Sequence, residues 1–181
     1  MKSSSGFLAV LAICLSALTG CATAPTSSEG RSEIQNESAS VLAKAQSNDQ
    51  TLTRVLNDAR GYAVFPSIGK GAIGIGGAYG RGVLYENGTA IGYCDMKQAS
   101  IGLQLGGQKY AEIIAFTTKE AIDNFKTGNF AFDAQATAVA LKSGAGANAK
   151  YSSGVAVFTM DEAGLMYEAS VGGQKFSYQA K

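Results

Sequence analysis

The stretch from Lys70 to Tyr85 reads KGAIGIGGAYGRGVLY and carries only alanine or glycine at even positions from 72 to 82. The odd positions hold most of its larger residues: Ile73, Ile75, Tyr79, Arg81, Val83 and Tyr85. Side chains alternate between the two faces of a strand, so this period of two places the small residues on one face. The many glycines exclude a stable helix. We therefore predict one long, strongly bent strand.

A strand face without side chains has two interpretations. Either another element of the protein packs very close to it, or space remains there for an acyl chain. A similar alternation of alanine with larger residues runs from Asp133 to Leu141 and predicts a second strand of this kind. The sequence does not choose between the two interpretations.

Turn and capping residues predict the elements around this stretch. Asn87-Gly88 tolerates the positive φ angles of a type I′ turn and predicts a hairpin. One helix is expected from Ser32, and a second follows Asn48 as N-cap and ends before Gly61. A third short helix is expected near 118–127, where Thr117 and Glu120 form a capping box.

Further alternating runs complete the predicted fold. They lie at Ala111–Phe116, Val155–Met160 and Leu165–Val171. The fold class is therefore mostly β within an α+β arrangement. We expect a strongly bent antiparallel sheet, barrel-like or sandwich-like, with two N-terminal helices and the short helix near 118–127.

The N-terminus has the layout of a bacterial lipoprotein signal. Lys2 precedes an apolar run that begins at Phe7 and ends in Leu18-Thr19-Gly20-Cys21. This run is shorter than the roughly 20 residues that span a bilayer core. Ordinary secretory cleavage after Ala24 is the alternative, but it would leave Pro25 at the first mature position. We predict that residues 1–20 are removed and that Cys21 is lipidated.

Acylation of Cys21 would attach the mature protein to a membrane without spanning it, since several acyl chains hold a protein lastingly. The similarity to lipoprotein signals also suggests the outer membrane, because Ala22 and not Asp follows the cysteine. Residues 21–31 are rich in Ser, Thr, Pro and Gly and are expected to form a flexible tether. Residues 32–181 are expected to form a single domain.

Composition excludes several functions. The net charge is +1 without a basic stripe, so nucleic acid is not an expected partner. The chain has no His, which removes Ser-His and Cys-His catalysis and the commonest transition-metal ligand. The adjacent Asp161-Glu162 is interpreted as a turn and not as a catalytic dyad. Cys94 would be the remaining mature thiol and is expected to be buried. No enzyme activity, cofactor or metal is predicted.

Glycine motifs near lysines offer candidate binding residues. Gly69-Lys70-Gly71-Ala72-Ile73-Gly74 fits the pattern G-x-G-x-x-G, but the glycines that follow cannot form the helix that a nucleotide site needs. Gly106-Gly107-Gln108-Lys109-Tyr110 recurs as Gly172-Gly173-Gln174-Lys175-Phe176. Such glycine pairs are typical of bends where a sheet closes. Alternatively, Lys70, Lys109 and Lys175 contact anionic lipid headgroups.

Three segments together resemble the SYLF domain. They are Asn57-Asp58-Ala59-Arg60-Gly61-Tyr62-Ala63-Val64-Phe65, Ala99-Ser100-Ile101-Gly102-Leu103-Gln104-Leu105-Gly106-Gly107-Gln108 and Ile113-Ile114-Ala115-Phe116-Thr117, with the glycine-alternating strand between the first two. The resemblance covers roughly Val41 to the C-terminus. It implies a compact, mostly antiparallel β-domain that binds lipid.

Eukaryotic members of the SYLF family bind phosphoinositides and actin, but actin is absent from a bacterial envelope and is not an expected partner here. The resemblance and the signal together predict an outer-membrane lipoprotein that binds phospholipid or another amphiphile. The alternative is an envelope scaffold that binds a protein partner, or a second copy of itself, through a sheet edge or the N-terminal helices.

Overall fold

The computed structural model describes residues 25, 27–73, 75–101, 106–128, 130–131, 139–140, 144–149, 151–161 and 173–181. Its centre is a seven-stranded sheet in the order β5-β6-β4-β1-β2-β3-β7. The pairings are antiparallel except for the parallel contact of β5 with β6. The strands are β1 Gly61–Ile73, β2 Ile75–Glu86, β3 Thr89–Ile101, β4 Gly106–Phe116, β5 Val139–Ala140, β6 Val155–Asp161 and β7 Gln174–Ala180.

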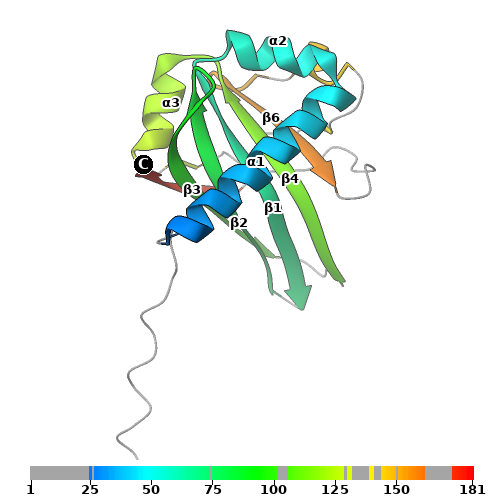
Figure 1. The fold of residues 1–181 in the computed structure, drawn as a ribbon. Helices are drawn as coiled ribbons and strands as arrows, with labels where there is room; N and C mark the ends of the chain where they lie inside the picture. Colours follow the sequence, from blue (N-terminus) through cyan, green and yellow to red (C-terminus); the bar gives the residue numbers. More distant parts are fainter. Residues whose placement is uncertain are drawn as a thin grey trace, which may run out of the picture.

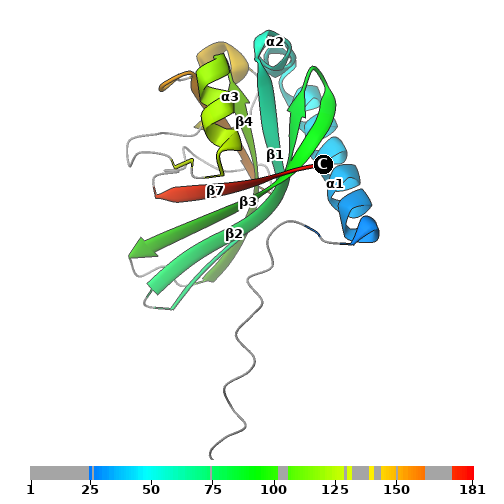
Figure 2. The ribbon, with the colours of Figure 1, turned by 90° about the vertical axis from the view of Figure 1, so that its left-hand side faces the viewer.

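Helices cover both faces of the sheet. The helices are α1 Ser28–Asn48, α2 Gln50–Asp58 and α3 Lys119–Lys126, and a 3₁₀ turn η1 spans Gly146–Asn148. Figure 1 shows α1 running diagonally across the sheet, and Figure 2 shows α1 and α3 on opposite sides of it. The predicted mostly-β α+β class and the bent antiparallel sheet are confirmed, and the described strands leave the sheet open.

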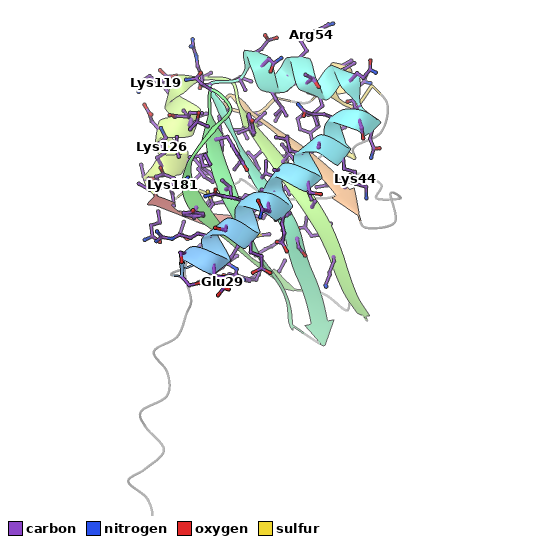
Figure 3. The ribbon with its side chains drawn as sticks, viewed as in Figure 1. Glu29, Lys44, Arg54, Lys119, Lys126 and Lys181 are labelled. Atoms are coloured by element: carbon purple, nitrogen blue, oxygen red, sulfur yellow. The ribbon has the colours of Figure 1, made fainter. Side chains whose placement is uncertain are left out.

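Two apolar clusters fill the space between these layers. One lies under α1 and α2 and contains Leu52, Val83 and Ile113. The other lies on the opposite face and joins α3 to the sheet through the rings of Phe116, Phe125, Phe130 and Phe176. The exposed charged side chains Glu29, Lys44 and Arg54 lie on the outer surfaces of α1 and α2 (Figure 3). Both faces of the central strands are thus buried over part of their length.

The predicted single strand from Lys70 to Tyr85 is wrong, because the chain reverses between Ile73 and Ile75. These two residues are register partners, as are Ala72 and Gly76. Near the reversal, even-numbered residues of β1 therefore pair with even-numbered residues of β2 and share a face with them. The alternation of small and large residues continues unchanged from one strand into the next. The sequence pattern is the same for one strand or two, so the alternation could not reveal the turn.

A bulge in β1 explains the close approach of the small-residue face. Phe65 and Pro66 of β1 stand opposite the single residue Gly82 of β2, where the register shifts. A Cβ atom on Gly82 would lie 2.5 Å from the Val64 carbonyl oxygen and 2.8 Å from Phe65 Cδ1. At this position the small face is filled by close packing within the protein. Most of the second alternating stretch, 133–141, lies outside the described residues.

The Asn87-Gly88 hairpin is confirmed, and both residues have positive φ, 48° and 73°.

Three cap assignments differ from prediction. Helix α1 begins at Ser28 and not Ser32, because the Ser27 side chain accepts a hydrogen bond from the Gly30 N–H. The N-cap of α2 is Asp49 and not Asn48. The N-cap of α3 is Thr118, while the Thr117 hydroxyl donates to the Gly154 carbonyl.

Candidate functional site

A row of basic residues crosses the outer face of the sheet, the face on which α1 packs. Lys97 of β3 is the register partner of both Tyr79 on β2 and Lys175 on β7. Gly69 of β1 continues the row, since it is the partner of both Tyr79 and Lys109. We call Lys109, Tyr79, Lys97 and Lys175 the basic row. Register partners share a face, so the row follows four strand spacings, roughly 19 Å when measured along the bent sheet.

The three lysines of the basic row are exposed to solvent. Tyr79 is 41% exposed, which is unusual for a large apolar side chain in this structure. Helix α1 contacts β1 and β2 and covers the sheet near Val83 and Tyr93, which lie on the same face as the basic row. The basic row lies beyond the part of this face that α1 covers.

A second row supports the first. This second row contains Arg81, Asp95 and Ser177, which are register partners two residues along each strand and therefore on the same face. Asp95 is 2% exposed and accepts hydrogen bonds from the Tyr79 hydroxyl at 3.0 Å and the Ser177 hydroxyl at 3.3 Å. Burial, and then the nearby Asp95 carboxylate, raise the pKa of Tyr79 to about 12. The ring of Tyr79 is therefore held in place and stays neutral at physiological pH.

The charges of the two rows favour an anionic partner. Four cations, Arg81 and the three lysines of the basic row, stand against the single carboxylate of Asp95, a difference of three positive charges among these described side chains. The carboxylate is buried beneath the surface, whereas the cations are exposed. Such a surface attracts phosphate groups or other anions at low ionic strength.

The structure brings together two of the three predicted lysines. Lys109 and Lys175 lie in the basic row, whereas Lys70 occupies the neighbouring register position, paired with Ala78 and Gln108. The surroundings of the Lys70 side chain lie outside the described residues. Lys97 was not predicted. A hairpin without a bulge would pair Tyr79 with Met96, but the register shift between Leu84 and Tyr85 moves Lys97 to that position.

Other predicted residues give a mixed result. Cys21, the predicted lipidation residue, and Glu162 lie outside the described residues, as does the side chain of Asp161. Cys94 is fully buried, and burial raises the pKa of its thiol well above the ordinary value, so it is an unreactive core residue as predicted. In the part of the chain that the structure describes, no helix is both long and apolar enough to cross a bilayer.

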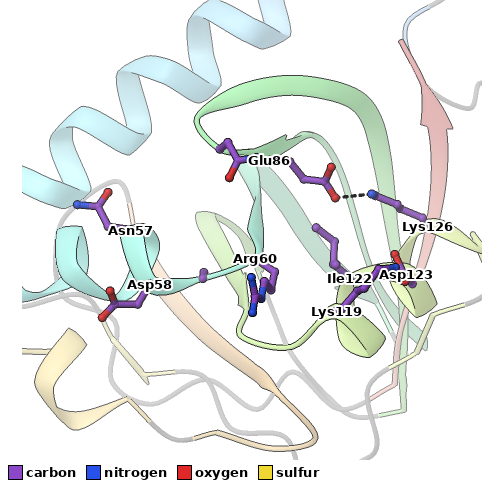
Figure 4. Close-up of a pocket in the computed structure, with 10 residues that line it drawn as sticks. Asn57, Asp58, Arg60, Glu86, Lys119, Ile122, Asp123 and Lys126 are labelled. Carbon is purple, nitrogen blue, oxygen red and sulfur yellow. Dashed lines mark hydrogen bonds and ion pairs between the residues drawn. The ribbon is translucent and has the colours of Figure 1, made fainter.

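A cleft of about 640 Å³ lies at the end of the sheet where α2, the β2–β3 hairpin and α3 meet (Figure 4). Its charged walls contain two ion pairs, Lys126 with Glu86 and Lys119 with Asp123. The remaining lining residues are Asn57, Asp58, Ala59, Arg60, Asn87 and Ile122. Three acidic and three basic side chains line it, so the cleft has no net charge to select an anion.

Comparison with known proteins supports the resemblance predicted from the sequence. The sequence model of the Ysc84 family, described as Las17-binding protein actin regulator, matches residues 97–181. This match confirms the resemblance to the SYLF family, which is a family of lipid-binding domains. The matched region contains Lys97, Lys109 and Lys175.

A curated relative is Beta cell expansion factor A of Aeromonas veronii. It is 29% identical over 152 residues, which cover 83% of this chain and 58% of that protein. The chain therefore spans little more than half the length of this relative.

Proposed function

We propose that this protein is a non-enzymatic lipoprotein of the bacterial envelope whose domain binds phospholipid at a membrane surface through the basic row. The observation that carries the proposal is the placement of Lys109, Lys97 and Lys175 in one exposed row with Tyr79. Lysines near an anionic bilayer contribute about 1 kcal/mol each, and a tyrosine ring suits the boundary between headgroups and water.

The described residue nearest to the predicted anchor, Pro25, is held close to the face of the sheet that carries the basic row. The Arg31 side chain donates to the Pro25 carbonyl at 2.9 Å, and its guanidinium lies 5.3 Å from the centre of the Tyr93 ring. Tyr93 lies four residues before Lys97 on β3, which is about 13 Å along a strand. Cys21 is four residues before Pro25, and four residues reach at most about 14 Å. Lipid on Cys21 would thus hold the basic row near the bilayer.

The small-residue strand face gives less support to an internal lipid site. At Gly82, and at Gly80, where a Cβ would lie 2.6 Å from Ile68 Cγ1, the protein itself occupies the space. Surface recognition is therefore the form of lipid binding that we propose.

The test is co-sedimentation of residues 22–181, without the acyl anchor, with vesicles of neutral phosphatidylcholine or with added anionic phosphatidylglycerol. We expect binding to the anionic vesicles at 50 mM salt and its loss at 500 mM, because salt screens exposed charges. Salt-insensitive binding would instead indicate an apolar pocket. If no vesicles bind, Cys21 would be the sole membrane contact and the scaffold function would be favoured.

A further inference from the structure

A buried carboxyl group joins two distant strands across the concave side of the sheet. Gln174 Nε2 on β7 donates a hydrogen bond to Glu112 Oε2 on β4 at 3.0 Å. In the sheet order, β1, β2 and β3 separate these two strands. The sheet bends so strongly that β4 and β7 come together through this pair of side chains. Both side chains are 0% exposed.

Polar atoms around this pair have unmet hydrogen bonds. Glu112 Oε1 and Gln174 Oε1 are both buried without a hydrogen-bond partner, and so is the hydroxyl of Thr159, the register partner of Glu112. An ionised Glu112 and the amide oxygen of Gln174 are both acceptors, so neither can satisfy the other. A proton on Glu112 Oε1 would supply the missing donor. It would complete a two-bonded ring between the carboxylic acid and the amide.

The described neighbours of Glu112 offer no cation to stabilise a negative charge. On β4, Tyr110 faces the same side, and burial together with Glu112 raises the pKa of its hydroxyl. On β1 the register partner is Phe65, on β6 it is Thr159, and Asp161 occupies the position opposite Tyr110. Burial raises the pKa of Glu112 to about 7, although the Gln174 hydrogen bond opposes this rise.

We propose that at mildly acidic pH Glu112 is a neutral acid whose proton bridges to Gln174, and that this acid–amide pair is a pH-sensitive latch between β4 and β7. Loss of the proton leaves an uncompensated charge inside the protein and two acceptors facing each other. Movement of β7 away from β4 then costs less free energy, because this movement gives the carboxylate access to water. This property is independent of lipid binding by the outer face.

The direct test is a ¹³C NMR titration of the Glu112 carboxyl in the full-length chain in detergent micelles. We expect a midpoint near pH 7. A midpoint near the ordinary value of 4.5 would overturn the proposal. Thr159→Val should leave the midpoint high; a further large rise would show that the Thr159 hydroxyl was stabilising the carboxylate instead.

Hydrogen exchange tests the opening. After correction for intrinsic exchange rates, the equilibrium constant for opening, measured at the β7 amides, should increase roughly 30-fold between pH 5.5 and pH 8 in the wild type. Glu112→Gln is the matched control, since its amide can form both hydrogen bonds of the ring and does not titrate. Exchange in Glu112→Gln should be independent of pH. An equal increase in this variant would contradict the latch.

Discussion

The carboxylate of Asp49 accepts a hydrogen bond of 2.5 Å from the backbone N–H of Gly146, which lies 97 residues further along the chain. The same side chain accepts from Thr51 and Gly144 at 3.0 Å. Asp49 thus caps α2 and fastens the start of η1, with the turn before it, to the joint between α1 and α2. This buried carboxylate connects the N-terminal helices to the C-terminal half of the domain, and the hydrogen bond from the Ala147 N–H to the Thr51 hydroxyl adds to the same connection.

Asp49→Ala should lower the free energy of unfolding by roughly 2 to 4 kcal/mol, because it removes a helix cap and leaves buried N–H groups unpaired. Urea denaturation at pH 7 measures this change. Asp58→Ala is the control, since Asp58 is exposed at the end of the same helix and should cost less than about 0.5 kcal/mol. Equal effects in both variants would show that the Asp49 contacts contribute little.

Asp49 also predicts an acid dependence of stability. Burial raises the pKa of this carboxyl, but the hydrogen bonds from Gly146, Thr51 and Gly144 outweigh burial and hold it below 3.8. A carboxyl group whose pKa is lower in the folded state than in the unfolded state stabilises the protein at pH values above the unfolded-state pKa. This stability is lost as the pH falls below about 4. Asp49→Asn should therefore lose less stability than the wild type between pH 4 and pH 2. Parallel curves would contradict this.

Ionisation of Glu112 has the opposite effect on stability from ionisation of Asp49. Its folded-state pKa is raised from 4.5 to about 7, so ionisation opposes folding increasingly from pH 4.5 to 7 and by a constant amount above that. This rise corresponds to roughly 3 kcal/mol. Glu112→Gln should gain stability relative to the wild type by up to this amount at pH 8 and little at pH 4. Denaturation curves at the two pH values measure the difference, and a gain that is the same at both would count against it.

Gly82→Val tests the close packing opposite the β1 bulge. The added side chain would meet the Val64 carbonyl and the Phe65 ring, and we expect a loss of roughly 1 to 3 kcal/mol or more. Gly69→Ala is the control in the same sheet, because a Cβ on Gly69 meets no atom within 4 Å. A Gly82→Val protein with unchanged melting temperature would mean that the strands separate there at little cost. The surroundings of Gly76 lie outside the described residues.

Cys94 should resist modification in the folded protein. In residues 22–181 it is the sole cysteine, and it is fully buried with a raised thiol pKa. A thiol reagent at pH 8 should label the native protein far more slowly than protein in 6 M guanidinium chloride. Rapid labelling of the native form would show that β3 opens readily.

Local signals in the sequence predicted much of the fold. Asn87-Gly88 predicted its hairpin because both residues tolerate positive φ, which the type I′ turn requires. Asp49 was missed as a cap because the adjacent Asn48 is an equally favourable N-cap residue type, and its bonds to Gly144 and Gly146 join residues that are distant in sequence. Lys97 was missed because its place in the basic row depends on a one-residue bulge, which no local pattern marks.

The central claim is that the basic row binds an anionic membrane surface. The most direct measurement compares vesicle co-sedimentation of Lys97→Gln/Lys175→Gln with that of Lys44→Gln/Lys119→Gln, which removes the same charge from exposed positions on α1 and α3. At about 1 kcal/mol for each lysine, the first variant should bind roughly 30-fold more weakly than the wild type. The second should bind nearly as well as the wild type. Equal losses in both variants would contradict the claim, since binding would then follow net charge and not this surface.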